Sequence, residues 1–519
     1  MIDSLAAHRT LAHGEQLARQ ARQRPETIAL SFGDSDLTYR QLDERVNRLA
    51  RALQARGVSK GDRVAVLMHN RLEVVESYLA VLRLGAIVVP VNFRLVAAEV
   101  EYILSDSGAE VLVVDEPMTS LAAQLAPRLV RTVLVTGGDA SRVSDTALDY
   151  ESVLDPDDSS LDIVVDDHDP AFIMYTSGTT GRPKGAVLSH LNLAMNTVNS
   201  MIEHQVRTEG EVWYSGLPLF HIGGLNGILI YLMAGGRSII APSGNFDPVS
   251  TIETLEQEEV TSCYFVPTQW KELCAVPGVR DRKLSLRRIM WGASVAPPSV
   301  LSAMAETFPN IPTLNVFGQT EMSSVTCILR GEDAIPKMGS VGTPIVNVEA
   351  RVVDGNGDDV QQGNVGEIVY RGPTVMQGYW NRPDATEEAF RDGWFHSGDL
   401  VRQDEDGFLF VVDRAKDMII SGGENIYCAE VEAVIDQHPG VAEVAVVGAP
   451  HPKWVETPVA IVVPTDPNDP PSEEDVIEFC RSRMASYKKP TSVVVTDSLP
   501  RTATGKVQKF RLRESLSAN

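Results

Sequence analysis

Hydrophobic positions in the first third of the chain follow two different periods. Between Leu42 and Leu53, apolar residues recur every three or four positions, which is typical of one face of an α-helix. Thr38 precedes this pattern and can cap the helix, and Gly57 follows it and can end it. Elsewhere the apolar runs are short and continuous, which predicts buried strands. These runs are residues 64–68, 111–114 and 133–135.

Strands that alternate with helical patterns predict parallel sheets in an α/β architecture. The pattern changes after Asp413, where about 105 residues remain, a length that suits a small α+β domain. Its predicted elements are strands near 444–447, 459–463 and 493–495 and a helix near 474–484. We therefore expect a large multi-lobed α/β domain with parallel sheets, followed by a small α+β domain.

Charge is unevenly distributed along the chain. The 519 residues include 46 basic and 70 acidic side chains, a net charge of −24, which argues against a general nucleic-acid binder and against broad adhesion to anionic lipid. Residues 137–170 carry eleven acidic side chains and one basic side chain. Such a run is typical of a solvated surface segment, and we expect it to join two lobes. Residues 481–519 instead carry nine basic and two acidic side chains.

Cysteine usage and hydropathy favour a cytoplasmic protein. The five cysteines are scattered and form no Cys-x-x-Cys pair, which argues against a disulfide framework or a zinc site and favours a reducing compartment. The first 24 residues lack the apolar core of a signal peptide. The most apolar stretch, residues 222–236, is shorter than the roughly 20 residues that a membrane-spanning helix needs, so no integral membrane segment is expected.

The most informative motif is YTSGTTGRPKG at residues 175–185. Hydroxyl side chains alternate with glycines, and Lys184 follows them. Glycines let a backbone approach a ligand closely, while N–H groups and hydroxyls suit phosphate oxygens. Pro183 stands where a P-loop needs its second glycine, so the motif is not a P-loop. A flexible polar turn is the alternative, but the preceding apolar strand and Lys184 favour phosphate binding.

This segment resembles the phosphate-binding signature of the adenylate-forming superfamily, which includes acyl-CoA synthetases, luciferases and adenylation domains of peptide synthetases. Five further signatures follow in the order of that family. They are FGQTE at 317–321, GWFHSGD at 393–399, DRAKDMI at 413–419, SGGENI at 421–426 and PRTATGK at 500–506. The resemblance covers essentially the whole chain and is strongest to actinobacterial fatty-acyl-CoA synthetases. It implies the adenylate-forming fold, with a small mobile C-terminal domain.

The resemblance implies an ATP site. The residues expected around the phosphates are Thr176, Ser177, Gly178, Thr179, Thr180 and Lys184. The Phe317 ring is expected to stack on adenine, although relatives mostly carry Tyr there, and Gly292 is expected to lie beside the nucleotide. Thr320 is expected to bond the α-phosphate, and Glu321 to provide a hard oxygen ligand for Mg²⁺. Taken alone, Glu321 would be read as a solvated carboxylate.

Three charged residues complete the implied adenylation machinery. Asp399 resembles the residue that accepts hydrogen bonds from both ribose hydroxyls, and Arg414 is expected to reach the same ribose. Lys506 resembles the lysine that moves over the α-phosphate and the substrate carboxylate, where an ammonium group stabilises developing charge. Outside these motifs, a surface ion pair and a solvated lysine would be the ordinary interpretations.

The resemblance also implies a second half-reaction. In relatives that form thioesters, the small domain rotates after adenylation, and Gly422 and Gly423 are expected to line the CoA channel. Lys416 matches the hinge position. The implied divisions are an N-terminal domain at 1–412, a hinge at 413–416 and a mobile domain at 417–519. Cys428 stands where relatives commonly carry Pro, and no activating base accompanies it, so we do not expect a catalytic thiol.

Residues 218–230 resemble the segment that builds the acyl site. His221 looks like the gate at its mouth and is counted among the catalytic residues, with a core histidine as the alternative. The expected acyl-binding residues are His221, Gly223, Trp291, Gly292 and Ala293. No fixed charge in these segments would pair with the ammonium group of an amino acid, which favours an uncharged apolar acid. The small residues, Gly224 and Gly227 among them, either floor a long tunnel or pack helices closely.

These observations predict an ATP- and Mg²⁺-dependent acyl-CoA synthetase. A medium- to long-chain fatty acid would become an acyl-adenylate with release of pyrophosphate, and CoA would then displace AMP. An aryl-acid CoA ligase, which Trp291 keeps open, and a stand-alone enzyme that loads a carrier protein are the alternatives. A non-catalytic nucleotide sensor is disfavoured because Glu321 and Lys506 are present. The expected partners are the carboxylic acid, ATP and CoA, with no nucleic acid, while a peripheral membrane contact and a homodimer stay open.

Overall fold

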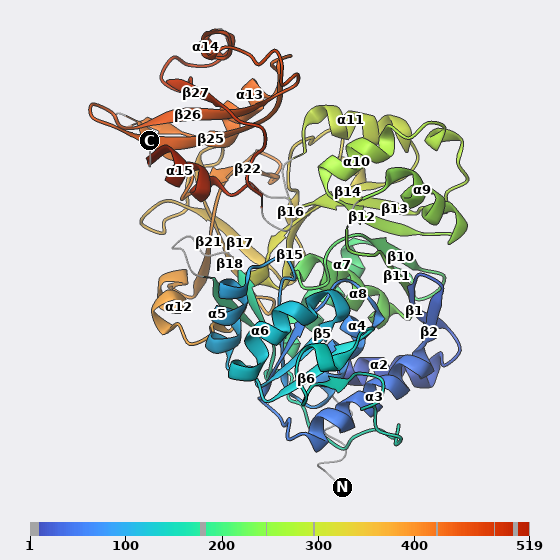
Figure 1. Cartoon of the computed structure of the whole chain (residues 1–519). Helices are drawn as coiled ribbons and strands as arrows, with labels where there is room; N and C mark the ends of the chain where they lie inside the picture. The colour runs from blue at the N-terminus through green and yellow to red at the C-terminus, as the bar shows by residue number, and fades with distance from the viewer. Residues whose placement is uncertain are drawn as a thin grey trace. The chain divides into compact units, whose positions relative to one another are not determined.

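The computed structural model describes residues 10–176, 183–244, 246–293, 296–421, 424–481, 483–501 and 507–517, without the side chains of residues 424 and 517. The chain forms two units (Figure 1). The first contains Met1–Met338, Gly342–Glu349 and Arg371–Phe395, and the second contains Gly339–Val341, Ala350–Tyr370 and His396–Asn519. The expected hinge and small domain fall within the second unit, and their boundaries stay a prediction.

The first unit is built on two largely parallel sheets. Among the described residues, nine strands pair in the order β16-β15-β14-β13-β12-β10-β11-β1-β2. Their bounds in that order are Thr343–Pro344, Ser324–Leu329, Thr313–Gln319, Arg288–Gly292, Ser262–Phe265, Val212–Ser215, Arg237–Ile240, Ile28–Phe32 and Ser35–Thr38. The strands from β14 to β1 run parallel, and antiparallel strands close both edges.

The second sheet of this unit holds eight strands of the described chain, in the order β19-β9-β8-β4-β3-β5-β6-β7. Their bounds in that order are Gly378–Tyr379, Lys184–Ser189, Pro170–Thr176, Ile87–Pro90, Arg63–Leu67, Val111–Asp115, Thr132–Thr136 and Leu148–Asp149. Strands β8 to β7 run parallel, whereas β9 and β19 are antiparallel additions at one edge. The three predicted strands correspond to β3, β5 and β6.

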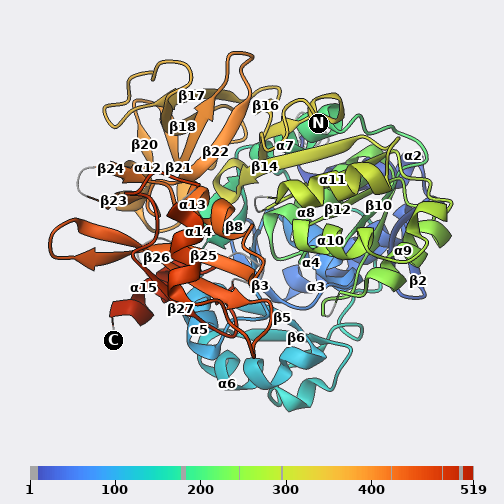
Figure 2. The same ribbon diagram turned by 90° about the horizontal axis from the view of Figure 1, so that it is seen from above.

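Helices cover both sheets of the first unit. They are α2 (His13–Gln23), α3 (Tyr39–Ala55), α4 (Leu72–Arg83), α5 (Ala97–Ser107), α6 (Thr119–Leu129), α7 (His190–Glu203), α8 (Ile222–Ala234), α9 (Pro248–Gln257), α10 (Pro267–Cys274), α11 (Pro298–Thr307) and α12 (Pro383–Ala389). Short 3₁₀ turns are η1 (Glu116–Met118), η2 (Ala140–Arg142), η3 (Val279–Asp281), η4 (Thr320–Met322) and η5 (Gly331–Asp333). Figure 1 shows α9, α10 and α11 along the strands β12 and β13, and Figure 2 shows α5 and α6 beside β5 and β6.

Local sequence chemistry explains the predicted helix. The Thr38 side chain accepts a hydrogen bond from the Gln41 backbone N–H, and the Gln41 side chain accepts one from the Thr38 backbone, which forms a capping box. The apolar face from Leu42 to Leu53 is buried. Gly57 follows the helix with a φ of 81°, a conformation that other residues rarely adopt. The predicted helix and both of its end signals are confirmed.

The acidic segment at 137–170 does not join two lobes. It leaves β6 and returns to β8 of the same sheet, and it adds β7 at the sheet edge. Tyr150 within it is fully buried. Its carboxylates face arginines of α3: Glu151 lies 2.6 Å from Arg45, and Asp157 lies 3.4 Å from Arg51. A charge run can therefore be solvated on one side and paired on the other.

The second unit contains two smaller sheets. One pairs β17 (Glu349–Val353), β18 (Val365–Arg371), β21 (Trp394–Gln403) and β22 (Leu409–Arg414). The short strand β20 (Phe390–Arg391) belongs to the first unit and pairs with Trp394 and Phe395, the first residues of β21. The other pairs β24 (Glu424–Ile426), β23 (Ile419–Ser421), β26 (Val455–Pro464) and β25 (Val441–His451), with β27 (Ser492–Val495) beside β26.

Helices pack on both faces of the sheet that contains β25 and β26. Helices α13 (Cys428–Ile435) and α14 (Glu473–Arg481) cover one face, and α15 (Lys509–Ser517) covers the other. The α+β elements predicted after Asp413 are present here. Across the described residues of the whole chain, no helix combines the length and apolar character that a bilayer crossing requires.

Candidate active site

The ends of two neighbouring strands hold the first pair of expected ATP-binding residues. Thr176 ends β8, Lys184 begins β9, and the antiparallel register places them opposite each other. The intervening candidates Ser177, Gly178, Thr179 and Thr180 lie outside the described residues, as do Gly422, Gly423 and Lys506. The assignments of these seven residues therefore stay predictions.

Glu321 lies in the short turn η4, directly after β14. Gly318 precedes the turn, and a Cβ atom there would lie 1.7 Å from the Ser324 carbonyl oxygen, so only glycine fits between β14 and β15. The Glu321 Oε1 atom accepts a hydrogen bond from the Tyr379 hydroxyl at 3.0 Å and one from the Thr176 hydroxyl at 3.4 Å. The structure thus brings the two predicted residues Thr176 and Glu321 together, although 145 positions separate them.

Lys184 lies beside Tyr379, the residue that hydrogen-bonds Glu321. Its ammonium nitrogen lies 5.2 Å from the centroid of the Tyr379 ring, a cation–π contact. Thr320, at the start of η4, is half-buried beside Glu321. A cation, hydroxyl groups and a carboxylate therefore converge where β8 ends and β9 begins.

This donor set fits a nucleotide-bound magnesium ion. Within the described part of the chain, no group of three or more His, Cys, Asp and Glu side chains could hold a metal ion alone. A magnesium ion at Glu321 would instead take its remaining oxygen ligands from ATP phosphates and water, the arrangement that Mg²⁺ usually adopts. Lys184 would provide positive charge for the same phosphates.

Gly292 and Phe317 lie on adjacent strands. Gly292 ends β13, and its register partner on β14 is Val316, the residue before Phe317. A Cβ atom on Gly292 would lie 2.1 Å from the Val316 carbonyl oxygen and 2.7 Å from the Tyr264 hydroxyl. Ala293 follows with a φ of 66°, an uncommon conformation for a residue with a side chain. Backbone packing therefore requires glycine at 292, and the Tyr264 hydroxyl is close to it.

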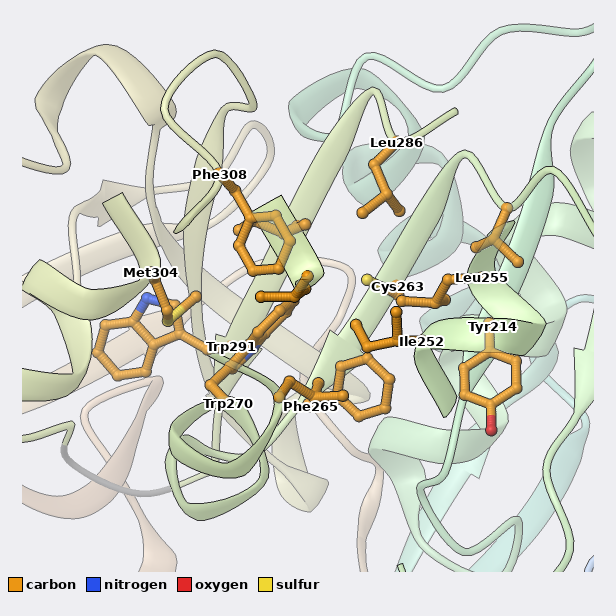
Figure 3. Close-up of a cluster of buried hydrophobic side chains, with 14 of the residues drawn as sticks. Tyr214, Ile252, Leu255, Cys263, Phe265, Trp270, Leu286, Trp291, Met304 and Phe308 are labelled. Atoms are coloured by element: carbon orange, nitrogen blue, oxygen red, sulfur yellow. The ribbon is translucent and has the colours of Figure 1, made fainter. Parts of the chain in front are cut away.

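Trp291 does not share this face of the sheet. It is 5% exposed and packs in the hydrophobic cluster beneath α9, α10 and α11, where Figure 3 shows it with Trp270, Met304 and Phe308. It also lines a cavity of about 130 Å³ on that side, together with α11. Because successive side chains of a strand point to opposite faces, Trp291 and Gly292 are separated by the sheet itself.

The acyl-site segment begins with a capping histidine. His221 is the N-cap of α8, and its Nδ1 atom accepts a hydrogen bond from the Gly223 backbone N–H at 3.3 Å. Gly224 and Gly227 are required by packing, since Cβ atoms there would lie 2.3 Å from the Pro218 carbonyl oxygen and 2.8 Å from the Trp213 indole. The close-packing alternative therefore explains these two glycines, and no tunnel is needed to account for them.

Asp399 and Arg414 meet in the second unit. They are register partners on β21 and β22, and the Arg414 guanidinium forms an ion pair with Oδ1 of the buried Asp399. Lys416 follows β22, and its carbonyl oxygen accepts a hydrogen bond from Arg513 of α15 at 3.1 Å. The two residues expected at the ribose are thus adjacent, and their role stays a prediction.

Sequence reasoning did not find Tyr379 or Tyr264. Tyr379 reaches Glu321 only because β19 pairs with β9, and a lone Gly-Tyr pair gives no chemical signal by itself. Tyr264 stands in a short apolar strand, where a tyrosine reads as core. Alternation along β12 and β13 assigns residues to two faces, but it does not show which face meets the substrate.

Comparison with known proteins identifies the family of this chain. The AMP-binding enzyme family matches residues 17–380, and the AMP-binding enzyme C-terminal domain matches residues 430–506. The chain belongs to the AMP-binding enzyme family. This confirms the family resemblance and the predicted fold.

Individual relatives cover nearly the whole chain. It is 41% identical to a feruloyl-CoA synthase from Amycolatopsis over 96% of this chain and 98% of that protein. It is 37% identical to the long-chain-fatty-acid–CoA ligase FadD13 of Mycobacterium tuberculosis, over 93% and 94% of the two chains. The solved structure of O-succinylbenzoate coenzyme A synthetase from Bacillus subtilis with ATP and magnesium ion matches with a TM-score of 0.85 and 33% identity, covering 97% of this chain and 99% of that chain.

The relatives support the coarser functional prediction, an ATP-dependent ligase of carboxylic acids and CoA. The predicted ATP, Mg²⁺ and CoA, and the expectation of small-molecule partners, are confirmed at this level. The fatty acid is not confirmed, because both aromatic-acid and fatty-acid ligases are among the relatives.

Proposed function

We propose that this enzyme activates a compact aromatic carboxylic acid, with a polar ring substituent, as its CoA thioester. The observation that carries the proposal is the hydroxyl of the half-buried Tyr264, which lies beside Gly292. No protein group in the described part of the chain hydrogen-bonds this hydroxyl. Burial raises the pKa of Tyr264, so the group stays protonated and can donate to a substrate oxygen.

Packing around α8 supports a compact substrate. The glycines that suggested a long tunnel are needed for close contacts, and the Trp213 indole fills the space beside Gly227. Trp213 also stacks on Tyr231 of α8, with ring centroids 4.9 Å apart. Both rings are buried, so core side chains fill this space and leave less room for a long flexible chain. The similarity to feruloyl-CoA synthase points the same way.

The proposed chemistry has two steps. A carboxylate oxygen of the acid attacks the α-phosphorus of ATP, and the bond to the pyrophosphate oxygen breaks. The CoA thiolate then attacks the acyl carbonyl carbon, and AMP leaves with the electrons of the carbon–oxygen bond. Lys184, Thr320 and Lys506 are assigned to the phosphate charge, and Asp399 and Arg414 to the ribose. Magnesium held by Glu321 would neutralise phosphate charge.

The second step is assigned to the C-terminal part of the chain. Gly422 and Gly423 would line the CoA path, and rotation about Lys416 would exchange the two half-reactions, as expected from the resemblance. The enzyme is proposed to act in the cytoplasm, where the five free thiols would remain reduced.

A substrate panel tests the proposal. AMP release with free CoA would be followed for 4-hydroxycinnamate, cinnamate, octanoate and hexadecanoate. We expect kcat/KM to be highest for the hydroxylated aromatic acid and lowest for hexadecanoate. Preference for hexadecanoate would instead support the fatty-acid ligase, and adenylation without transfer to free CoA would support a carrier-loading enzyme.

A further inference from the structure

Tyr379 lies where three segments of the candidate active site meet. Its hydroxyl donates to the Oε1 atom of Glu321 at 3.0 Å, and its ring lies under the Lys184 ammonium group. These are different parts of one side chain, so the same residue touches a predicted metal ligand and a predicted phosphate-binding cation. Tyr379 is half-buried, which limits competition from water for the hydrogen bond.

The backbone around Tyr379 is held from both sides. On one side β19 pairs with β9, and the Trp380 N–H donates to the Gly185 carbonyl at 2.7 Å. On the other side the Met376 N–H donates to the Glu321 carbonyl at 2.8 Å. The segment therefore ties the strand that carries Lys184 to the turn that carries Glu321, and Tyr379 adds the side-chain contact between them.

A carboxylate that holds Mg²⁺ benefits from a fixed orientation. Among the described residues, the hydrogen bonds to Glu321 from Tyr379 and Thr176 both end on Oε1, which leaves Oε2 for a metal ion in this proposal and limits rotation of the group. Partners of metal ligands commonly act in this way, and their loss weakens metal binding without removing a ligand. The Thr176 hydroxyl contacts the same oxygen at the longer distance of 3.4 Å, so it is the weaker partner.

We propose that Tyr379 is a positioning residue that orients Glu321 toward the magnesium ion of bound ATP and fixes Lys184 beside the phosphates. This inference rests on the proposed role of Glu321 as the metal ligand. Tyr379 itself touches neither substrate nor metal in the proposal. Its hydroxyl and its ring have separable effects, because Phe removes the first and keeps the second.

The test compares Tyr379→Phe with Tyr150→Phe. The Tyr150 hydroxyl also donates to a carboxylate at 3.0 Å, that of Glu76, but it lies in the acidic segment away from the predicted ATP-binding residues. Binding of Mn²⁺ to the enzyme–ATP complex would be followed by electron paramagnetic resonance, and metal-free ATP binding by calorimetry in EDTA. Tyr379→Phe is expected to weaken Mn²⁺ binding about tenfold, with metal-free ATP binding nearly unchanged.

Further variants separate the possible outcomes. Glu321→Gln should weaken Mn²⁺ binding more than Tyr379→Phe, Thr176→Val should weaken it less, and Tyr150→Phe should leave it as in the wild type. Tyr379→Leu, which also removes the ring, should in addition weaken metal-free ATP binding through Lys184. Loss of Mn²⁺ binding in Glu321→Gln but not in Tyr379→Phe would overturn the role of Tyr379 and leave that of Glu321 intact. Unchanged Mn²⁺ binding in Glu321→Gln would overturn the roles of both Glu321 and Tyr379. The proposed acid substrate is tested separately, by the substrate panel with the wild-type enzyme.

Discussion

Trp291 and Gly292 are consecutive residues of β13, yet they serve opposite faces of the nine-stranded sheet. Trp291 packs in the cluster beneath α9, α10 and α11, whereas Gly292 approaches Tyr264. A single strand thus supports the core with one residue and borders the candidate acyl site with the next. We therefore propose Tyr264, and not Trp291, as the aromatic residue that recognises the substrate on this side.

Replacing Tyr264 with Phe should change substrate discrimination more than turnover. Loss of the hydroxyl should lower kcat/KM for 4-hydroxycinnamate about 10-fold to 100-fold, because a hydroxyl recognised by hydrogen bonding is strongly discriminated. The value for unsubstituted cinnamate should change little. Parallel kinetics with the two acids measure the ratio directly.

Tyr214→Phe is the matched control for that prediction. Tyr214 lies on β10, in the same sheet, and packs in the cluster on the opposite face. The Tyr214→Phe variant should leave the ratio of the kcat/KM values for the two acids unchanged. Equal losses for both acids in Tyr264→Phe would show that this hydroxyl supports the fold and does not recognise the substrate.

Gly227→Ala should destabilise the enzyme. The added methyl group would lie 2.8 Å from the Trp213 indole, so that overpacking should cost about 1–3 kcal/mol despite the better helix propensity of Ala. Gly223→Ala is the control, because its Cβ atom would have 3.3 Å to the nearest side-chain atom. Thermal unfolding of both variants tests the difference. A Gly227→Ala enzyme of normal stability that rejects only longer acids would indicate a tunnel at this position.

Features that depend on residues close together in the sequence could be predicted from it. The capping box at Thr38 and the apolar runs of β3, β5 and β6 depend on near neighbours, and the structure has them where they were predicted. The sequence also predicted Thr176 and Glu321 as site residues, because each lies in a distinctive short motif, and their roles stay predictions. Their meeting in space follows from strand pairing between distant segments.

The features that the sequence did not predict depend on which side chains from distant segments fill the space beside a residue. The sequence around Gly227 in α8 is compatible with a tunnel or with close packing, and only the position of Trp213, on the strand β10, decides between them. The acidic segment read as solvated because its arginine partners belong to α3, about a hundred positions earlier. Long-range partners of this kind leave no periodic pattern in the sequence around either residue.

Cys428→Pro should destabilise the second unit, even though Pro is favoured at the first position of a helix. The Cys428 backbone N–H donates to Oδ2 of the buried Asp413, and Pro has no N–H to replace it. Removing one donor from a buried carboxylate costs about 1–3 kcal/mol. Cys428→Ala keeps the N–H and, like Pro, removes the thiol with its core packing and its contact with the Asp417 carbonyl, so it is the control for denaturant unfolding. Equal stability of the two variants would show that this hydrogen bond contributes nothing.

Three buried histidines should make stability depend steeply on pH. Burial is the main cause that lowers the pKa of His13 and His204 to about 3 and that of His190 to about 4, from the ordinary value of 6.5. Both ring nitrogens of His190 and His204 lack hydrogen-bond partners among the described residues. Neutral rings are therefore favoured in the folded state, and the unfolded chain binds protons that the folded chain does not.

Because the pKa values of these histidines are lowered in the folded state, acid should destabilise the protein. Stability from the three groups is fully present above pH 6.5 and is lost as pH falls toward 4, by about 1 kcal/mol per pH unit for each histidine. The free energy of unfolding, measured with urea between pH 8 and pH 5, should fall with increasing slope. His204→Gln should make that slope shallower, whereas the same change at the exposed His168 should not. A stability that is flat between pH 6.5 and pH 5 would contradict the burial of neutral rings at these positions.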